Sequence, residues 1–259
     1  MKGDRPLFAR GDRIVTLAAL FVVTLLCWFY LYRMTAGMSA VAAEHDMHAA
    51  MGMTDMAAWG ATELLGLFVM WMVMMAGMML PSATPVILLV MNTYRRRGGR
   101  EARGSTLTFV CGYLFAWTGF SVAAAALQAV LHRAALMSPA MVSQSTVIAT
   151  AIFLIAGVYQ WMPLKAACLT HCRSPLHFLT HEWREGPLGG FIMGLRHGFF
   201  CVGCCWALML LLFAVGVMNL FWVAAIAAFV LVEKLLRRGM LFSRIAGVIC
   251  ILWGAYLLA

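Results

Sequence analysis

The sequence alternates long apolar runs with short polar segments that are rich in arginine and lysine. Most of the runs approach or exceed the length of about 20 residues that an α-helix needs to cross a bilayer. Proline at positions 81 and 85 is expected to interrupt the second run, because proline removes a helical hydrogen bond. The pattern predicts an all-α fold, a polytopic transmembrane helix bundle of about seven spans. We expect its helices at about 14–34, 60–94, 106–132, 144–163, 188–217, 220–236 and 242–258.

Composition supports a single integral membrane domain over residues 1–259. The chain is 64% hydrophobic and only 11% charged, whereas soluble domains carry about 25% charged residues. The net charge of +9 could suggest a nucleic-acid partner. The basic residues, however, lie in short clusters between the apolar runs, as the positive-inside rule expects. The partner that the pattern predicts is therefore the lipid bilayer, and no nucleic acid is expected.

The same charges predict the orientation. With the N-terminus in the cytoplasm, 16 lysines and arginines fall on the inner side and only Arg33 and Arg133 on the outer side. Arg196 is left inside the fifth predicted helix. This topology leaves an outer loop rich in methionine and histidine at about 35–59, and an inner loop at about 164–188.

The fifth predicted helix carries a cluster of residues that are costly to place in lipid. His197 and Cys201 are four residues apart, and Cys204 and Cys205 follow three and four residues after Cys201. On a helix these side chains share one face. Thiolates and an imidazole on one face suit Cu(I) or Zn(II). The alternative, that these cysteines are small packing residues, stays open.

Three further groups offer soft ligands. In the outer loop, His45 and His48 lie among methionines and form a candidate capture segment for copper, or else simply face water. At the inner end of the fourth helix, Cys168 and Cys172 are four residues apart and form a candidate inner pair. The second helix carries a methionine stripe near the predicted depth of the fifth-helix cluster, although methionine is also an ordinary core filler. Its candidate ligands are Met74, Met78 and Met79.

Three segments resemble the signature of a bacterial family of largely uncharacterised integral membrane proteins with a predicted metal-binding role, a domain of unknown function. They are Trp71-x2-Met74-x3-Met78-Met79-x-Pro81, Pro163-Leu164-Lys165-x2-Cys168-x3-Cys172-Arg173-x-Pro175 and Gly194-x3-Gly198-x2-Cys201-x-Gly203-Cys204-Cys205-Trp206-x2-Met209. Gly77 departs from the alanine expected there, and the outer loop is not part of the resemblance. The resemblance implies metal binding and a bacterial inner (plasma) membrane protein that crosses the bilayer several times. It supplies no reaction.

Together these patterns predict a protein that binds a soft metal, copper with zinc as the alternative, and acts in metal transfer, transport or metal-site assembly. A metal chaperone or a larger membrane complex would be its partner. The ordered ligand groups suggest inward transfer, with Arg196 balancing the charge of the thiolates. Two alternatives stay open: an accessory subunit of a larger membrane enzyme complex, and a quinone-linked thiol oxidoreductase based on Cys201 and Cys204. The small size of the predicted domain and the lack of an acid–base pair in its predicted spans favour the accessory subunit among these alternatives.

Overall fold

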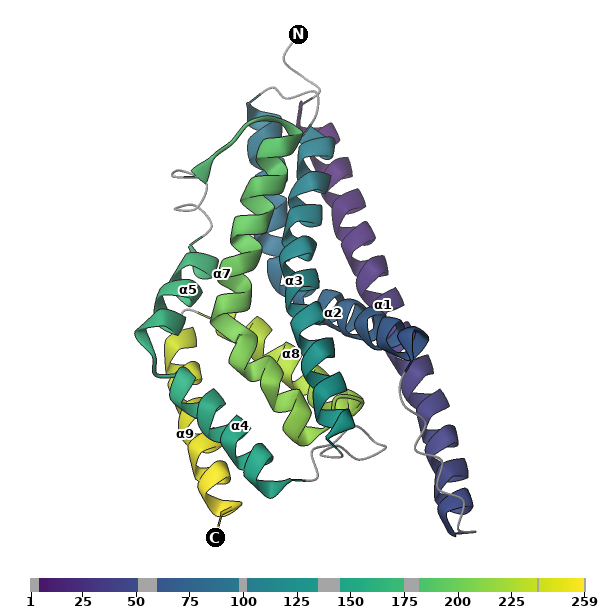
Figure 1. Ribbon diagram of the computed structural model, residues 1–259. Coiled ribbons are helices and arrows are strands. Elements are labelled where there is room, and N and C mark those ends of the chain that lie inside the picture. Colours follow the sequence, from purple (N-terminus) through teal and green to yellow (C-terminus); the bar gives the residue numbers. More distant parts are fainter. Residues whose placement is uncertain are drawn as a thin grey trace.

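The computed structural model describes residues 5–50, 60–97, 102–134, 145–174, 182–236 and 238–258, and side chains before residue 60 only for Gly11 and residues 13–37. These residues form helices without strands, which confirms the all-α prediction. The helices are α1 (Arg5–Ala50), α2 (Ala61–Arg96), α3 (Ala102–Arg133), α4 (Thr146–Tyr159), α5 (Pro163–Arg173), α7 (Gly186–Val215), α8 (Leu220–Leu235) and α9 (Gly239–Tyr256) (Figure 1).

Among the described residues, five helices are long and apolar enough to cross a membrane, or up to six if the bent pair α4–α5 counts as one span. About seven spans were predicted. One difference is α8, whose 16 residues reach only about 24 Å at the helical rise per residue. The hydrocarbon core is about 30 Å thick. The cytoplasmic position of the N-terminus stays a prediction.

The helices α3 and α7 lie side by side in the middle of the bundle (Figure 1). Glycines make this close approach possible. A Cβ added to Gly194 of α7 would stand 1.9 Å from the carbonyl oxygen of Phe109, and one added to Gly190 would stand 2.3 Å from that of Ser105. The small-residue spacing of the fifth predicted helix therefore serves helix packing, as its sequence pattern allows.

Helix α2 runs without a break through Pro81 and Pro85, although an interruption was predicted. It changes direction instead: Figure 1 shows one part crossing the bundle sideways and the other running behind α3 and α7. A bend at proline is the expected result of losing a helical hydrogen bond. The carbonyl of Met79, just before the prolines, accepts hydrogen bonds from Ser82 Oγ at 2.9 Å and Tyr113 Oη at 3.3 Å.

The predicted fourth span is broken into α4 and α5, whose axes differ by 64°. Pro163 is in the first turn of α5, where proline is well tolerated because its missing N–H would have no helical partner. The bend directs α5 onto α7, where the ring of His171 stacks on that of Phe200 with centroids 3.7 Å apart. Part of the predicted inner loop at about 164–188 is thus a helix packed on the bundle.

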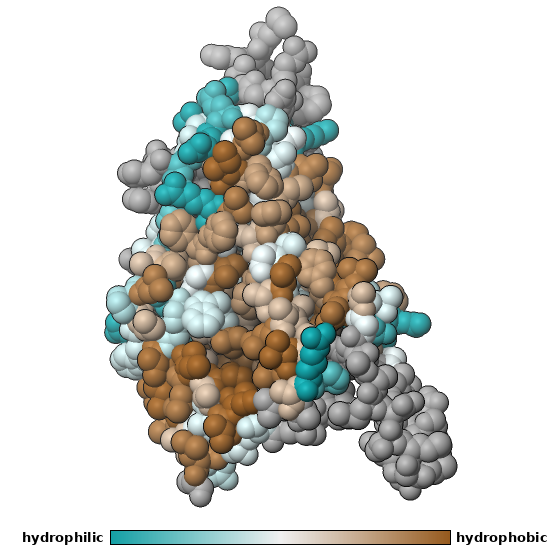
Figure 2. Space-filling model, in the orientation of Figure 1, coloured by the Kyte–Doolittle hydropathy of each residue, from teal (hydrophilic) through white to brown (hydrophobic). Residues whose placement is uncertain are grey.

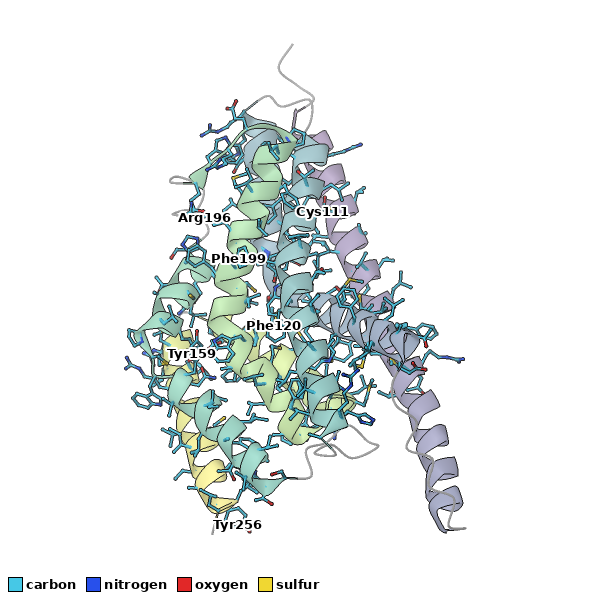
Figure 3. The ribbon with its side chains drawn as sticks, in the orientation of Figure 1. Cys111, Phe120, Tyr159, Arg196, Phe199 and Tyr256 are labelled. Carbon is cyan, nitrogen blue, oxygen red and sulfur yellow. The ribbon has the colours of Figure 1, made fainter. Side chains whose placement is uncertain are left out.

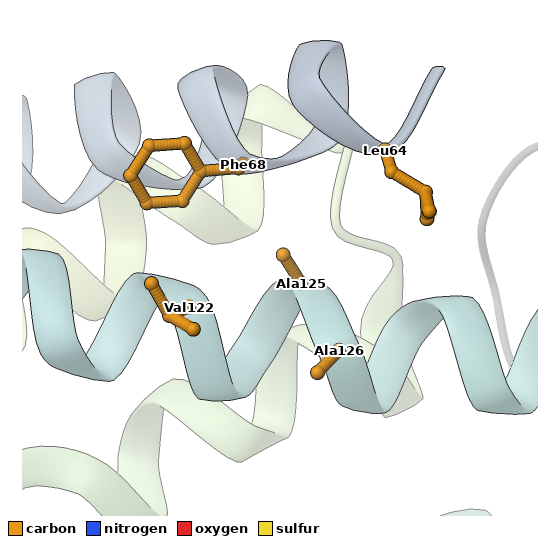
Figure 4. Close-up of a pocket in the computed structure, with 5 residues that line it drawn as sticks. All are labelled: Leu64, Phe68, Val122, Ala125 and Ala126. Atoms are coloured by element: carbon orange, nitrogen blue, oxygen red, sulfur yellow. The ribbon is translucent and has the colours of Figure 1, made fainter. Parts of the chain in front are cut away.

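The outer surface fits a lipid environment. Figure 2 shows a broad hydrophobic area over the middle and lower parts of one face, with hydrophilic residues gathered toward the upper end. An apolar pocket opens between α2 and α3, lined by Leu64, Phe68, Val122, Ala125 and Ala126 (Figure 4). Its lining has no polar side chain, so it is a shallow part of the apolar surface and not a site for chemistry.

Candidate metal site

The three neighbouring cysteines of α7 are all turned into the protein. Cys201, Cys204 and Cys205 are at most 1% exposed, because residues three and four apart lie on the same face of a helix. The thiols of Cys204 and Cys205 donate to the carbonyl oxygen of Cys201 at 3.1 and 2.9 Å. Helical spacing therefore gathers these sulfur atoms in one buried place, as the sequence indicated.

A fourth thiol comes from another helix. Cys172 of α5 is buried, and its thiol lies near that of Cys204 on α7. On the same helix, Cys168 Sγ lies 2.9 Å from where a Cβ on Gly203 would stand, so the Cys168 side chain packs directly on α7. The sequence suggested that Cys168 and Cys172 form a separate station at the inner mouth. The structure instead brings this pair against α7, beside the other thiols.

We call Cys172, Cys201, Cys204 and Cys205 the thiol cluster. Two of its members are joined through a third, because the thiols of Cys204 and Cys205 both donate to the carbonyl oxygen of Cys201. Helices α5 and α7 together therefore supply the cluster, and the bend between α4 and α5 is what brings its members together.

A lysine that the sequence did not single out lies at the cluster. Lys234 of α8 donates from Nζ to Cys201 Sγ at 3.0 Å and to Ser82 Oγ at 3.0 Å. Sequence reasoning counted Lys234 among the basic residues of an inner segment. Its only sequence signal was a place at the end of the predicted helix 220–236.

Arg196, which was expected to balance the thiolate charge, points elsewhere. Its Nε lies 3.1 Å from Glu182 Oε1, and its side chain is 57% exposed. Figure 3 shows Arg196 on the outer side of α7. The expectation was wrong because Arg196 lies on a different face of the helix from Cys201, and Lys234 takes the place beside the sulfur atom.

The imidazole of His197 is buried one turn before Cys201. It packs beside two aromatic rings, with centroids 6.1 Å from Phe109 and 5.9 Å from Tyr113. The helical spacing that placed His197 on the cysteine face is therefore correct, but its ring lies in an aromatic layer next to the thiol cluster.

The candidate methionines are also buried. Met74, Met78 and Met79 are at most 1% exposed in the bend region of α2. Tyr113 links this region to the cluster, because its hydroxyl lies 3.1 Å from Cys201 Sγ and 3.3 Å from the carbonyl oxygen of Met79. This link runs through the backbone of Met79, and the role of the methionine thioethers as ligands stays a prediction.

The side chains of His45 and His48 lie outside the described residues. The backbone around them belongs to α1, which continues to Ala50 where a loop was predicted.

Within the described part of the chain, no three His, Cys, Asp or Glu side chains already converge on a point that could hold a metal ion. The thiols of Cys204 and Cys205 are instead engaged in hydrogen bonds to the carbonyl oxygen of Cys201. The donor set itself fits a soft ion, since thiolates select Cu(I) and zinc. Metal binding here would require thiols to rotate away from their helix.

Residues 68–257 match the model of a protein family described as PpoB2, copper chaperone. The chain belongs to this family. The matched region contains the whole thiol cluster and Lys234, and it begins after His45 and His48. Membership supports copper-related metal handling, in agreement with the metal-binding role that the sequence motifs implied. Comparison with curated proteins and with solved structures found no match.

Proposed function

We propose that this protein is a copper chaperone of the bacterial inner membrane that carries Cu(I) as its cargo on the thiol cluster. The observation that carries the proposal is that buried thiols of α5 and α7 lie close together, with Cys172 near Cys204. Two helices separated by residues 174–185 place thiols next to each other, and the family description names copper.

The chemistry of the cluster favours Cu(I) over harder ions. Thiolates are soft ligands, and no described carboxylate joins the four sulfur atoms to suit a harder ion. The cysteines are almost fully buried, so a bound ion would be kept from water and from side reactions. A buried site of this kind suits holding and delivery of a reactive ion.

The position of the cysteine ligands on two helices, α5 and α7, also suits the transfer of a copper ion. An ion held between α5 and α7 can pass from one thiolate to the next without becoming free, because a new sulfur bond can form before the old one breaks. Helix α5 is joined to α4 through a sharp bend. A partner protein could therefore receive copper first from Cys172 or Cys168, which lie on this helix.

The test is copper content after loading. Purified protein in detergent is incubated with Cu(I) without oxygen, desalted, and analysed for copper per chain. We expect stoichiometric copper in the unaltered protein and a large loss in Cys172→Ser and in the triple variant Cys201→Ser/Cys204→Ser/Cys205→Ser. Unchanged copper in both variants would refute the proposal.

Two other cysteines provide matched controls. Cys111 of α3 is exposed and Cys250 of α9 is buried, and neither belongs to the cluster. Cys111→Ser and Cys250→Ser should keep full copper content. Equal losses in these variants would mean that copper binds the chain without a defined site.

The closeness of Cys172 to Cys204 also supports a second candidate function. If Cys172 and Cys204 were oxidised to a disulfide, two electrons and two protons could reduce a membrane quinone to its hydroquinone. Incubation of the reduced protein with a short-chain quinone distinguishes the two functions. Formation of hydroquinone together with a Cys172–Cys204 disulfide would favour the oxidoreductase, and thiols that stay reduced would favour the chaperone.

A further inference from the structure

A single cation lies against a sulfur atom of the thiol cluster among the described residues. Lys234 Nζ is within 3.0 Å of Cys201 Sγ, and its other close partner, Ser82 Oγ, is neutral. The nearby cation Lys165 is already balanced by Glu233, with 2.7 Å between Nζ and Oε1. Arg196 is balanced by Glu182 on the outer side of α7. The positive charge of Lys234 is therefore directed at the thiols.

From this geometry we propose that Lys234 is a specificity-determining residue, which makes the cluster prefer a monovalent soft ion over a divalent one. The inference rests on the proposed function, since it concerns the same thiol cluster. It adds a physical reason why the cargo would be Cu(I) and not Zn(II).

The number of ligands is the first step of the argument. In the described residues no three His, Cys, Asp or Glu side chains converge on one point. A tetrahedral Zn(II) site needs three or four protein ligands. The thiols of Cys204 and Cys205, by contrast, both donate to the carbonyl oxygen of Cys201, so they form a close pair on α7. The arrangement is closest to a site with two thiolates.

Charge is the second step. Two thiolates with a monovalent ion carry a net charge of −1, and two thiolates with a divalent ion carry none. A metal complex with a net charge is destabilised when it is buried in the protein away from water. The ammonium of Lys234 neutralises the first complex and leaves the second with a net charge of +1. The lysine therefore stabilises the Cu(I) complex and disfavours the Zn(II) complex.

Replacement of the lysine should then reverse the preference. Lys234→Met keeps much of the side-chain volume and removes the charge. The measured quantity is the ratio of Cu(I) to Zn(II) affinity, obtained by competition with chelators in detergent without oxygen. We expect the ratio to fall about tenfold, because Lys234 and Cys201 form a close, partly buried pair and removing one partner of such a pair has effects of this order.

Three variants make the result specific. Lys234→Arg keeps the charge and should keep the preference for Cu(I). Arg196→Met removes a cation that faces Glu182 and should leave the ratio unchanged. Ser82→Lys in the Lys234→Met background returns a positive charge from α2 to the neighbourhood of Cys201 and should restore part of the preference. Thermal unfolding in detergent identifies any variant that is not folded, and Lys234→Gln then replaces Lys234→Met.

The outcomes separate the two proposals. If the unaltered protein binds no copper that depends on its cysteines, the proposed function fails. If it binds such copper but the folded neutral variants keep the Cu(I) to Zn(II) ratio, only the role of Lys234 is overturned. A lowered ratio in the neutral variants, with the ratio kept in Lys234→Arg, supports it.

Discussion

Lys165 and Glu233 form an ion pair inside the helix bundle, with 2.7 Å between Nζ and Oε1, and both side chains are at most 1% exposed. Lys165 lies on α5, the helix of Cys172, and Glu233 immediately precedes Lys234 on α8. Gln160 receives hydrogen bonds from both Lys165 and Ser243 of α9. The pair therefore joins α5 to α8 beside the thiol cluster, and helps to set where Cys172 lies.

Breaking this pair should destabilise the protein and loosen the cluster. Glu233→Gln or Lys165→Met leaves one buried charge without its partner, which costs about 3–5 kcal/mol in other proteins. We expect a lower unfolding temperature in detergent and reduced copper retention for each single variant.

The double variant Lys165→Met/Glu233→Leu is the control for this prediction. It removes both charges, so it should recover most of the lost stability. If the single variants unfold at the same temperature as the unaltered protein, the pair does not hold α5 in place.

Close packing of α3 on α7 gives a second prediction. A Cβ at Gly194 would stand 1.9 Å from the carbonyl oxygen of Phe109, so Gly194→Ala should force the two helices apart and lower the unfolding temperature. Gly119→Ala on α3 is the matched control, because no atom lies within 4 Å of its added Cβ. Alanine is the better helix former by about 1 kcal/mol, so this control should be as stable as the unaltered protein or more so.

The sequence was informative wherever helical periodicity alone decides the geometry. The spacing of Cys201, Cys204 and Cys205 predicted one shared face, and all three are buried on α7. The glycines at 190, 194 and 198 fit close helix packing, and they lie against α3. Such features depend on the fixed rise and turn of a helix, which any helical sequence must follow.

Contacts between distant helices could not be predicted in the same way. The sequence placed Cys172 in a separate group, but the bend after Tyr159 carries it to Cys204. Neighbourhood in the sequence favoured Arg196 as the cation for the thiols, yet adjacent helical residues point about 100° apart. The cation that contacts Cys201 comes from a position 33 residues away, and no local pattern reports a pairing of that kind.

The closeness of Cys172 to Cys204 predicts a specific cross-link. In a chain whose other six cysteines are serine, mild oxidation should join these two residues in a disulfide, which mass spectrometry of proteolytic fragments detects. The oxidised protein should lose its remaining capacity for Cu(I), and a reductant should restore it. A chain that keeps only Cys111 and Cys204 should stay uncross-linked within the monomer, because Cys111 is exposed on α3. Efficient cross-linking of that control pair would contradict the arrangement.

The hydroxyl of Tyr113 connects the bend of α2 to the thiol cluster, which yields the last prediction. It lies 3.1 Å from Cys201 Sγ and 3.3 Å from the carbonyl oxygen of Met79. Tyr113→Phe removes only this group, at a cost of about 1 kcal/mol of stability for a lost hydrogen bond. We expect a slightly lower unfolding temperature and a Cu(I) affinity that changes several-fold while copper content at saturation is kept, since Cys201 keeps Lys234 as a neighbour.

Tyr159→Phe is the matched control, because its hydroxyl donates to the carbonyl of Gly203 and not to a sulfur atom. An equal change in Cu(I) affinity in both variants would mean that Tyr113 acts through general packing and not through its contact with Cys201.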